Sequence, residues 1–536
     1  MAPQPLKSKS FLLACFSALL LLPAGAMPLM ETTEARYAEI AREMIVSGNY
    51  LEPYFNAIKH FHKPPLTYWL VAAGLKTFGF NNFGARFFGI LAAIAAVIYV
   101  YRCACLFLDK DRGALTATIM FASSLLFLTV ARLASTEIYL VACVVAAQFY
   151  LLRQIYGQPG RSNALWFGLW LGLGFMIKGP IIFLFTLLPG LVGKLTDKRH
   201  RAIFSWRQTF AACGIFCAVA LPWYLLVVAK NPGLLAYFLK VQTVDRVVTD
   251  RFRRYEPPWY FFYIFTATFF PYILFFGKGL WRWKNLSSEL KTLLLYVALP
   301  MLVFTIAKGK HATYILPFYG TCAILTAAML KRDAMPRLRD ATAAILLVFA
   351  VAPAVAGMAY APLRSSLVPL LGSGLLLLAL WWMVWKSRQQ ETFWAATALL
   401  MLLFSTVAIV CVGIAGPNMR GYQQMAAAMN RIDPQRKLTT LIYHGFLPSV
   451  SFYRNQLAVM SFSDQRETQF QPETSYRPWY VTTESELTPI LAENPKLFVI
   501  VRKQEIEDFT TQHAYRCNVV FQQRKHSAYL CEANAP

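Results

Sequence analysis

Apolar runs of membrane-spanning length recur along most of this chain, and they constrain its fold more than any other feature. A run of roughly 18 or more apolar residues reads as a helix that crosses a bilayer. Thirteen spans follow from the sequence, the shortest of them beside the "KGP" motif: 10–29, 83–107, 114–131, 137–152, 164–177, 180–194, 209–229, 259–277, 290–306, 313–330, 341–360, 366–385 and 392–414. The sequence therefore predicts a mostly α, polytopic membrane protein.

The charge balance narrows the function classes. Of the 536 residues, 57% are hydrophobic and only 15% are charged, yet the net charge is +25. Basic cytoplasmic loops explain such an excess by topology alone, and basic patches also bind anionic lipid head groups. Nucleic-acid binding is excluded, because no soluble segment carries a basic surface interleaved with aromatic residues.

The placement of basic residues predicts the orientation of the chain. If the N-terminus is cytoplasmic, every loop on the cytoplasmic side contains Lys or Arg, as the positive-inside tendency requires. The first apolar run is followed by "PAGA", which resembles a signal-peptide cleavage site, but the run continues beyond it, which favours an uncleaved span. An odd number of spans then places the tail outside, together with loops 30–82 and 230–258.

The tail differs from the rest of the chain in composition. Short β-rich runs at 439–443, 497–501, 517–521 and 527–531 alternate with helical stretches at 419–431 and 484–493, which predicts an outer α/β domain over 415–536, after a membrane domain over 1–414. Cys517 and Cys531 fall on the last two strands. Strand pairing would bring them close in an oxidising compartment, so both a disulfide and two free thiols stay open.

The first outer loop begins with a dense run of charges, "METTEARYAEIAREM" (30–44). Its apolar and charged residues alternate with helical periodicity, and Gly48 is a plausible helix stop. One interpretation is an amphipathic helix on the membrane surface. The other is an ordinary loop helix with ion pairs three and four residues apart.

Polar side chains gather at the predicted outer face. Single residues there are explained by snorkelling, but cations are not expected on this side. Basic groups beside carboxylates suit a lipid-linked phosphate. The residues concerned are Glu31, Glu34, His60, His62, Lys63, Arg132, Thr136, Glu137, Lys178, Asp245, Arg246, Lys308, Lys310, His311 and Tyr314.

No cofactor motif accompanies these residues. The sequence has no Walker loop, dinucleotide fingerprint or nucleophile elbow. His60, His62 and His311 match no dedicated metal-site spacing with Glu31 or Glu34, so interfacial histidines are favoured over ligands. No cofactor is required by this interpretation, and a divalent metal would involve His62 at most.

Five segments resemble the bacterial aminoarabinose lipid A transferases, members of the glycosyltransferase-C superfamily that are related to protein O-mannosyltransferases. The segments occur in the family order: "TEARYAEIAREM" (33–44), which includes Arg36 and Tyr37, "HKPPLTYW" (62–69), "NNFGARF" (81–87), "MIKG" (176–179) and "AKGKHATYILP" (307–317). The resemblance covers most of the predicted membrane domain and is weak over the tail. It implies a glycosyltransferase-C fold in the bacterial inner membrane.

The resemblance also implies an activity. The family moves a sugar, 4-amino-4-deoxy-L-arabinose in these transferases, from undecaprenyl phosphate to a lipid A phosphate at the periplasmic face, a lipopolysaccharide modification associated with polymyxin resistance. Carried over by position, Lys63, Arg246 and Tyr314 hold the carrier phosphate. Lys308 and Lys310 add cations that stabilise the leaving phosphate, and Lys178 lies at the outer end of its span.

This chain departs from the family at its acidic positions. The resemblance implies Asp where Thr33 stands, and Glu where His62 stands; the second acidic position, usually Asp, is Glu137. An acceptor phosphate is already ionised and needs little general-base help. We therefore expect Glu34 or Glu31, with Glu137, to fill the carboxylate roles.

Other functions fit a polytopic chain. A same-fold transferase acting on another glycan or a protein hydroxyl differs only in its acceptor. A lipid transporter or flippase would show internal repeats and polar residues in mid-span, whereas the polar groups here gather at one face. A non-enzymatic role gains weight from Thr33.

Overall fold

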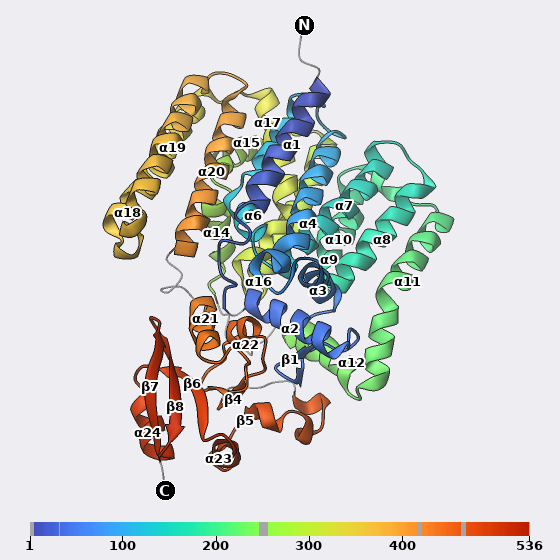
Figure 1. The fold of residues 1–536 in the computed structure, drawn as a ribbon. Helices are drawn as coiled ribbons and strands as arrows, with labels where there is room; N and C mark the ends of the chain where they lie inside the picture. The colour runs from blue at the N-terminus through green and yellow to red at the C-terminus, as the bar shows by residue number, and fades with distance from the viewer. Residues whose placement is uncertain (1–4, 32, 246–255, 415–420, 463–467, 535–536) are drawn as a thin grey trace. The chain divides into compact units, whose positions relative to one another are not determined.

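The computed structural model describes residues 5–31, 33–245, 256–414, 421–462 and 468–534 (Figure 1). Contacts divide the chain into two compact units. The helical unit comprises Met1–Pro23 and Gly89–Ile409, and the sheet unit comprises Ala24–Phe88 and Val410–Pro536. The predicted membrane domain (1–414) and outer domain (415–536) remain a prediction. The two compact units have other boundaries, because Ala24–Phe88 belongs to the sheet unit.

The chain is a multi-pass membrane protein. Among the described residues, eight helical segments are long and apolar enough to cross a membrane, and each coincides with a predicted span. They are α4 (Asn82–Ala104), α7 (Thr136–Tyr156), α11 (Trp206–Lys230), α16 (Ser288–Ile306), η5 with α17 (Ala312–Phe318, Tyr319–Arg332), α18 (Pro336–Ala359), η6 with α19 (Ala361–Ser366, Leu367–Ser387) and α20 (Phe393–Ile414).

The other five predicted spans form shorter, broken or less apolar helices. The run predicted as 10–29 is helical only as α1 (Pro5–Leu21). The others are α5 and α6 (Gly113–Ala122, Leu125–Val130), α8 (Arg161–Lys178), α9 and α10 (Ile181–Phe185, Leu187–Val192), and α14 and α15 (Tyr260–Thr268, Tyr272–Leu280). The breaks fall at Ser124, Thr186 and Pro271. The hydroxyl groups of Ser124 and Thr186 can compete with helical hydrogen bonds, and Pro271 has no N–H group to form one. The remaining turns of this unit are η1 (Gly193–Leu195), η2 (Lys198–Ala202), α12 (Leu234–Ala236), the π-helix η3 (Tyr237–Val244) and η4 (Trp283–Asn285).

Glycine permits close packing of α8 against α11 in the helical unit. A Cβ atom added at Gly168 would collide with the backbone of Ala212, and one at Gly172 would lie 2.9 Å from the Val219 side chain. The two glycines are four residues apart and therefore share one face of α8. Small residues at this spacing let membrane helices approach each other.

The sheet unit is built on six strands in the order β5-β4-β3-β6-β8-β7. The strands β3 (Thr440–Ile442), β4 (Val459–Ser461), β5 (Tyr480–Val481) and β6 (Lys496–Arg502) are parallel. β7 (Tyr515–Gln522) and β8 (His526–Ala533) add an antiparallel hairpin. Cys517 and Cys531 are opposite each other in this hairpin and form a disulfide.

Helices cover both faces of this sheet, and β6 shows why. Phe498 and Ile500 face one core, whereas Leu497, Val499 and Val501 face the other. The period of two is that of a strand buried on both sides. The helices of the tail are α21 (Gln423–Ile432), α22 (Pro448–Arg454), α23 (Glu484–Glu493) and α24 (Ile506–His513), with the short turns η8 (Thr468–Phe470), η9 (Glu473–Ser475) and η10 (Arg477–Trp479).

Segment 24–88 supplies part of the first of these cores. It contains α2 (Thr33–Ser47), the hairpin β1 and β2 (Tyr54–Phe55, Ile58–Lys59) and α3 (Leu66–Phe78). Tyr37, Ile40 and Met44 of α2 pack in one cluster with Met425 and Phe498 of the tail. The predicted helix is therefore present, and Gly48 follows it with a φ of 72°.

Of the two interpretations of α2, the structure favours the loop helix with ion pairs over the amphipathic helix on a membrane surface. Glu39 and Arg42 are buried and form an ion pair of 2.6 Å, three residues apart. Glu43 is buried as well and accepts hydrogen bonds from the backbone N–H groups of Asn56 and Ala57. A helix with satisfied, buried charges packs inside a protein, so α2 does not present this face to a membrane surface.

Candidate functional site

One predicted polar group is assembled in the helical unit at the ends of two helices. Glu137 lies in the first turn of α7, and Lys178 is the last residue of α8. The Lys178 Nζ atom lies 3.0 Å from Glu137 Oε1. Their side chains are only 11% and 14% exposed, so this ion pair is screened less by water than a surface pair.

The turn η5 brings three further side chains to this pair. The Thr313 hydroxyl lies 3.3 Å from Glu137 Oε1 and 2.8 Å from His311 Nδ1. The Tyr314 ring lies 4.9 Å from Lys178 Nζ, in cation–π contact. The five residues Glu137, Lys178, His311, Thr313 and Tyr314 are called the helical-unit cluster below.

The cluster combines a carboxylate with a cation and two hydroxyl groups. Thr136 Oγ1 donates to Glu137 Oε2 at 3.0 Å, so both carboxylate oxygens have partners. The ion pair and these hydrogen bonds fix the direction of the carboxylate. A fixed carboxylate beside an ammonium group can bind a polar ligand such as a sugar and can stabilise a developing negative charge.

Other predicted cations are not part of this cluster. Lys310 is buried, and its ammonium group donates to the backbone oxygens of Glu256 and Ala307 at 3.0 and 2.7 Å. Burial lowers the pKa of Lys310. Lys308 is exposed, and Arg246 lies outside the described residues. Lys310 therefore stabilises the loop before η5, and Lys308 alone of this pair offers an exposed ammonium group.

Arg132, grouped with Glu137 in the sequence, has different partners. It is buried and donates to the Ser405 and Thr406 hydroxyls of α20 at 2.7 and 2.8 Å. Its third contact is the Leu19 carbonyl oxygen at 3.3 Å. Arg132 therefore links α1 and α20 through uncharged oxygens.

In the sheet unit, Glu34 is held by Arg86. The Arg86 guanidinium donates to both carboxylate oxygens, at 2.7 and 2.9 Å, and both side chains are buried. Arg86 also donates to the carbonyl oxygens of Ala24, Met27 and Pro28 at 2.6–3.1 Å. The apolar run 22–29 is not helical, since Pro23 and Pro28 interrupt a helix, and its carbonyl groups bind an arginine instead. The contacts favour a positioning role for Glu34.

Glu31 has a different environment from Glu34. One oxygen accepts the Ser449 backbone N–H at 2.8 Å, while Oε2 is a buried atom with no hydrogen-bond partner among the described residues. Desolvation raises the pKa of Glu31 to about 8. Glu31 can therefore exchange a proton near neutral pH.

The remaining predicted residues of the first loop belong to the sheet unit. Lys63 is half-buried, and the rings of His60 and His62 lie 4.1 Å apart. Tyr37 packs on Tyr68, the Arg36 guanidinium lies 5.8 Å from the Phe446 ring, and Thr33 is exposed. Within the described residues, no group of three His, Cys, Asp or Glu side chains is arranged to hold a metal ion.

Sequence reasoning missed Arg86 and Thr313. Arg86 lies in "NNFGARF" and Thr313 in "AKGKHATYILP", both of which carried the resemblance. The signal for Arg86 was a lone arginine inside an apolar run, which needs a buried partner. The signal for Thr313 was weaker, because a hydroxyl two residues after a histidine is common in loops.

Comparisons with known proteins agree with the resemblance. The family model of dolichyl-phosphate-mannose-protein mannosyltransferase matches residues 12–238. Two relatives named undecaprenyl phosphate-alpha-4-amino-4-deoxy-L-arabinose arabinosyl transferase are similar to this chain. The one from Edwardsiella ictaluri is 30% identical over 58% of the chain, and the one from Yersinia pestis is 32% identical over 60%. The chain spans 57% and 59% of the lengths of these relatives.

The solved structures establish the fold. The crystal structure of ArnT from Cupriavidus metallidurans bound to undecaprenyl phosphate matches with a TM-score of 0.83 at 18% identity, covering 98% of both chains. The apo structure of the same protein matches equally well, at 17% identity. The chain has the glycosyltransferase-C fold of ArnT with a C-terminal sheet domain. Its predicted resemblance to the aminoarabinose transferase family is confirmed.

Proposed function

We propose that this chain is an integral membrane glycosyltransferase that moves a sugar, 4-amino-4-deoxy-L-arabinose, from undecaprenyl phosphate to a lipid A phosphate. The observation that carries the proposal is the helical-unit cluster, a fixed carboxylate–ammonium pair in a chain with the ArnT fold. The names of the relatives support the donor and the sugar. The orientation of the chain, with the N-terminus cytoplasmic and the tail periplasmic, is part of the proposal.

The reaction makes defined demands on the chain. An oxygen of the acceptor phosphate attacks the anomeric carbon, and the bond from that carbon to the carrier phosphate oxygen breaks. The electron pair of the broken bond stays on the carrier, which leaves as undecaprenyl phosphate. No proton moves, because the acceptor oxygen is already ionised at neutral pH.

The residues present suit these demands. Cations stabilise the charge that develops on the leaving phosphate; Lys178 lies within the cluster, and the resemblance assigns Lys63, Arg246 and Tyr314 to this task. Glu137 is fixed by Lys178 and two threonine hydroxyls, so it can orient the sugar and attract its amino group. Positioning of this kind lowers a barrier without a general base.

The proposal of a phosphate acceptor rests on the missing carboxylate at position 33 of the first loop. Thr33 stands where the family has a carboxylate, and Glu34 is bound to Arg86. A hydroxyl acceptor would need a base to remove its proton, whereas a phosphate would not. Glu31, with a pKa of about 8, carries a proton over most of the neutral range, so only a minor fraction of it is in the carboxylate form that could accept one.

The test is a transfer assay in membrane vesicles. The vesicles are supplied with undecaprenyl-phosphate-linked aminoarabinose and lipid A. The amount of modified lipid A is quantified by mass spectrometry for the wild type, Glu137→Gln and Lys63→Ala. We expect product from the wild type and a loss of about 10²-fold or more in both variants. Lys284→Ala, an exposed lysine far along the chain, is the control.

Two outcomes would change the proposal. Product on a protein or glycan hydroxyl with none on lipid A would indicate a same-fold transferase with another acceptor. Movement of the intact lipid across the vesicle membrane without any sugar transfer would indicate a transporter or flippase. Lipid A from cells with and without the gene supplies the matching measurement in vivo.

A further inference from the structure

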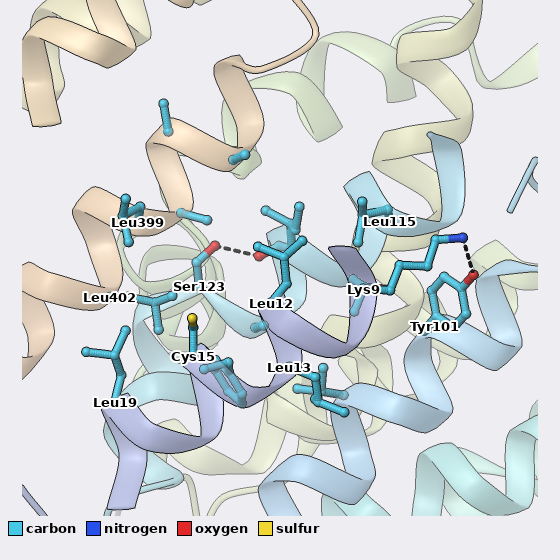
Figure 2. A pocket seen from close by; sticks show the side chains of 18 of the residues that line it. Lys9, Leu12, Leu13, Cys15, Leu19, Tyr101, Leu115, Ser123, Leu399 and Leu402 are labelled. Carbon is cyan, nitrogen blue, oxygen red and sulfur yellow. Dashed lines mark hydrogen bonds between the residues drawn. The ribbon is translucent and has the colours of Figure 1, made fainter. Parts of the chain in front are cut away.

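The helical unit contains a cavity of about 660 Å³ that the proposed reaction does not use. It lies between α1, α4, α5, α19 and α20, and its walls are side chains of apolar helices. Lys9 and Tyr101 lie at one end, and Leu19 and Leu402 lie toward the other (Figure 2). A volume of this size is typical of ligand sites.

Two hydroxyl groups in the lining of the cavity, those of Thr118 and Ser123, are already hydrogen-bonded within the protein. Thr118 donates to the Ala114 carbonyl oxygen at 2.7 Å, and Ser123 donates to the Ile119 carbonyl oxygen at 2.6 Å. The Ser123 hydroxyl also lies 2.7 Å from that of Tyr272. A polar ligand would lose its hydrogen bonds to water here without replacing them. The interior therefore suits a hydrocarbon chain.

One end of the cavity is cationic. Lys9 is the one charged residue in its lining, and its Nζ atom lies 3.1 Å from Tyr101 Oη and 2.7 Å from Asp111 Oδ1. Asp111 is 70% exposed, so this ion pair is a weak surface pair that a stronger anion can replace. Exposed Arg102 and Lys110 lie in the adjoining segment.

The length of the cavity corresponds to one leaflet. It follows α1 from Lys9 to Leu19, ten residues along the helix. At a rise of 1.5 Å per residue this is about 15 Å. The hydrocarbon core of a bilayer is about 30 Å thick. An acyl chain that starts at Lys9 and follows α1 to Leu19 therefore covers about half of that thickness.

We propose that this cavity is a binding site for an anionic phospholipid. One acyl chain fills the space between α1 and α20, and the phosphate lies against Lys9 and Tyr101, displacing Asp111 from the lysine. The bound lipid is a partner of the fold, distinct from the donor and acceptor lipids of the proposed reaction. The site does not depend on that reaction, so either proposal can fail alone.

The test measures lipid retention by the full chain. The protein is delipidated in detergent, incubated with phosphatidylglycerol or with phosphatidylcholine, and analysed by native mass spectrometry. We expect the wild type to retain more phosphatidylglycerol than phosphatidylcholine. In Lys9→Ala the ratio of the two retained lipids should fall about 5-fold, the effect of one cation at a lipid surface. Lys284→Ala, an exposed lysine outside the cavity, should match the wild type.

Two further variants separate the parts of the site. Ala395→Trp places an indole in the cavity and should lower retention of both lipids; Leu12→Trp does the same from α1 if the first variant does not give a monodisperse protein. Asp111→Asn frees Lys9 and should keep or increase phosphatidylglycerol retention. Equal losses in Lys9→Ala and Asp111→Asn would overturn the proposal, since the ion pair would then be structural. Wild-type retention by a folded tryptophan variant would also overturn it.

Discussion

The buried pair of Glu34 and Arg86 gives the sharpest test of how the first loop works. Both side chains are almost inaccessible, at 3% and 1% exposed. Glu34 accepts two hydrogen bonds from Arg86 and one from the Met30 backbone N–H at 3.0 Å. If Glu34 mainly stabilises the fold through these contacts, replacing it should lower the free energy of unfolding more than it lowers the transfer rate of the folded protein.

The two single substitutions should differ in size. In Glu34→Gln, Arg86 keeps its three carbonyl partners, so the free energy of unfolding should fall by about 3 kcal/mol, the lower end for breaking a buried pair. In Arg86→Met, the carboxylate loses both hydrogen bonds from the guanidinium, and three buried carbonyl groups lose their donor. We expect a loss of about 5 kcal/mol or more there.

The double substitution separates stability from chemistry. Replacing both partners by apolar residues of similar volume is often neutral for a buried ion pair. Glu34→Leu with Arg86→Met should therefore be more stable than Arg86→Met alone, although the backbone carbonyl groups stay unpaired. Its sugar transfer, normalised to the folded fraction, should stay close to that of the wild type, because on this reading Glu34 and Arg86 serve the fold and not the reaction.

The assay is denaturant unfolding in detergent, read together with transfer to lipid A in vesicles. Glu39→Gln, which breaks the neighbouring ion pair with Arg42, is the matched control for a buried charge in the same helix. A double variant that folds as well as wild type but transfers no sugar would refute the reasoning, since Glu34 would then have a chemical role. Equal stability losses in the two single variants would refute the asymmetry.

Three further predictions follow from the site and the sheet unit. Lys178→Met should lower kcat/KM for the donor by about 10²-fold. Tyr314→Phe keeps the ring beside Lys178 but loses one hydroxyl contact to phosphate, so it should raise KM for the donor roughly 10-fold. Unchanged kinetics in both variants would exclude these roles. Because burial raises the pKa of Glu31 from 4.5 to about 8, the folded state binds a proton that the unfolded state releases, so the contribution of Glu31 to stability is full below pH 4.5 and is lost as the pH rises through about 8; Glu31→Gln should reduce the fall of the thermal unfolding midpoint across this window, and an unaltered slope would contradict it. Replacing Cys517 and Cys531 by Ser should cost about 3 kcal/mol relative to the oxidised wild type, as for closing a loop of this 14-residue separation, read by denaturant unfolding; equal stability of the oxidised wild type and the variant would contradict it.

Much of the fold could be predicted because hydrophobic periodicity decides it. Long apolar runs such as 341–360 became single helices, and β6 formed where five apolar residues stand in a row at 497–501. The errors came where an apolar run was not a span. Residues 22–29 are apolar but include Pro23 and Pro28, which hydropathy alone does not register as helix breaks, and their carbonyl groups bind the distant Arg86.

The site was predicted only in part, for a related reason. Residue type and side of the membrane identified Glu137, Lys178, His311 and Tyr314, which the structure brings together. The roles of Glu34 and Lys310 depend on burial and on contacts to backbone oxygens, which sequence spacing does not express. Charged residues look alike in a sequence whether they serve the fold or a ligand.

The position of Thr33 links these observations. Successive residues of an α-helix point about 100° apart, so Glu34 cannot place its carboxylate where a side chain at position 33 would be. In this chain Thr33 is exposed, Glu34 is bound to Arg86 and Glu31 is bound to Ser449. None of the three replaces the family aspartate in place. A chain that has lost this carboxylate without a substitute can still transfer a sugar to an oxygen that is already ionised. Thr33, the residue at which this chain departs from the family, therefore supports a phosphate as the proposed acceptor.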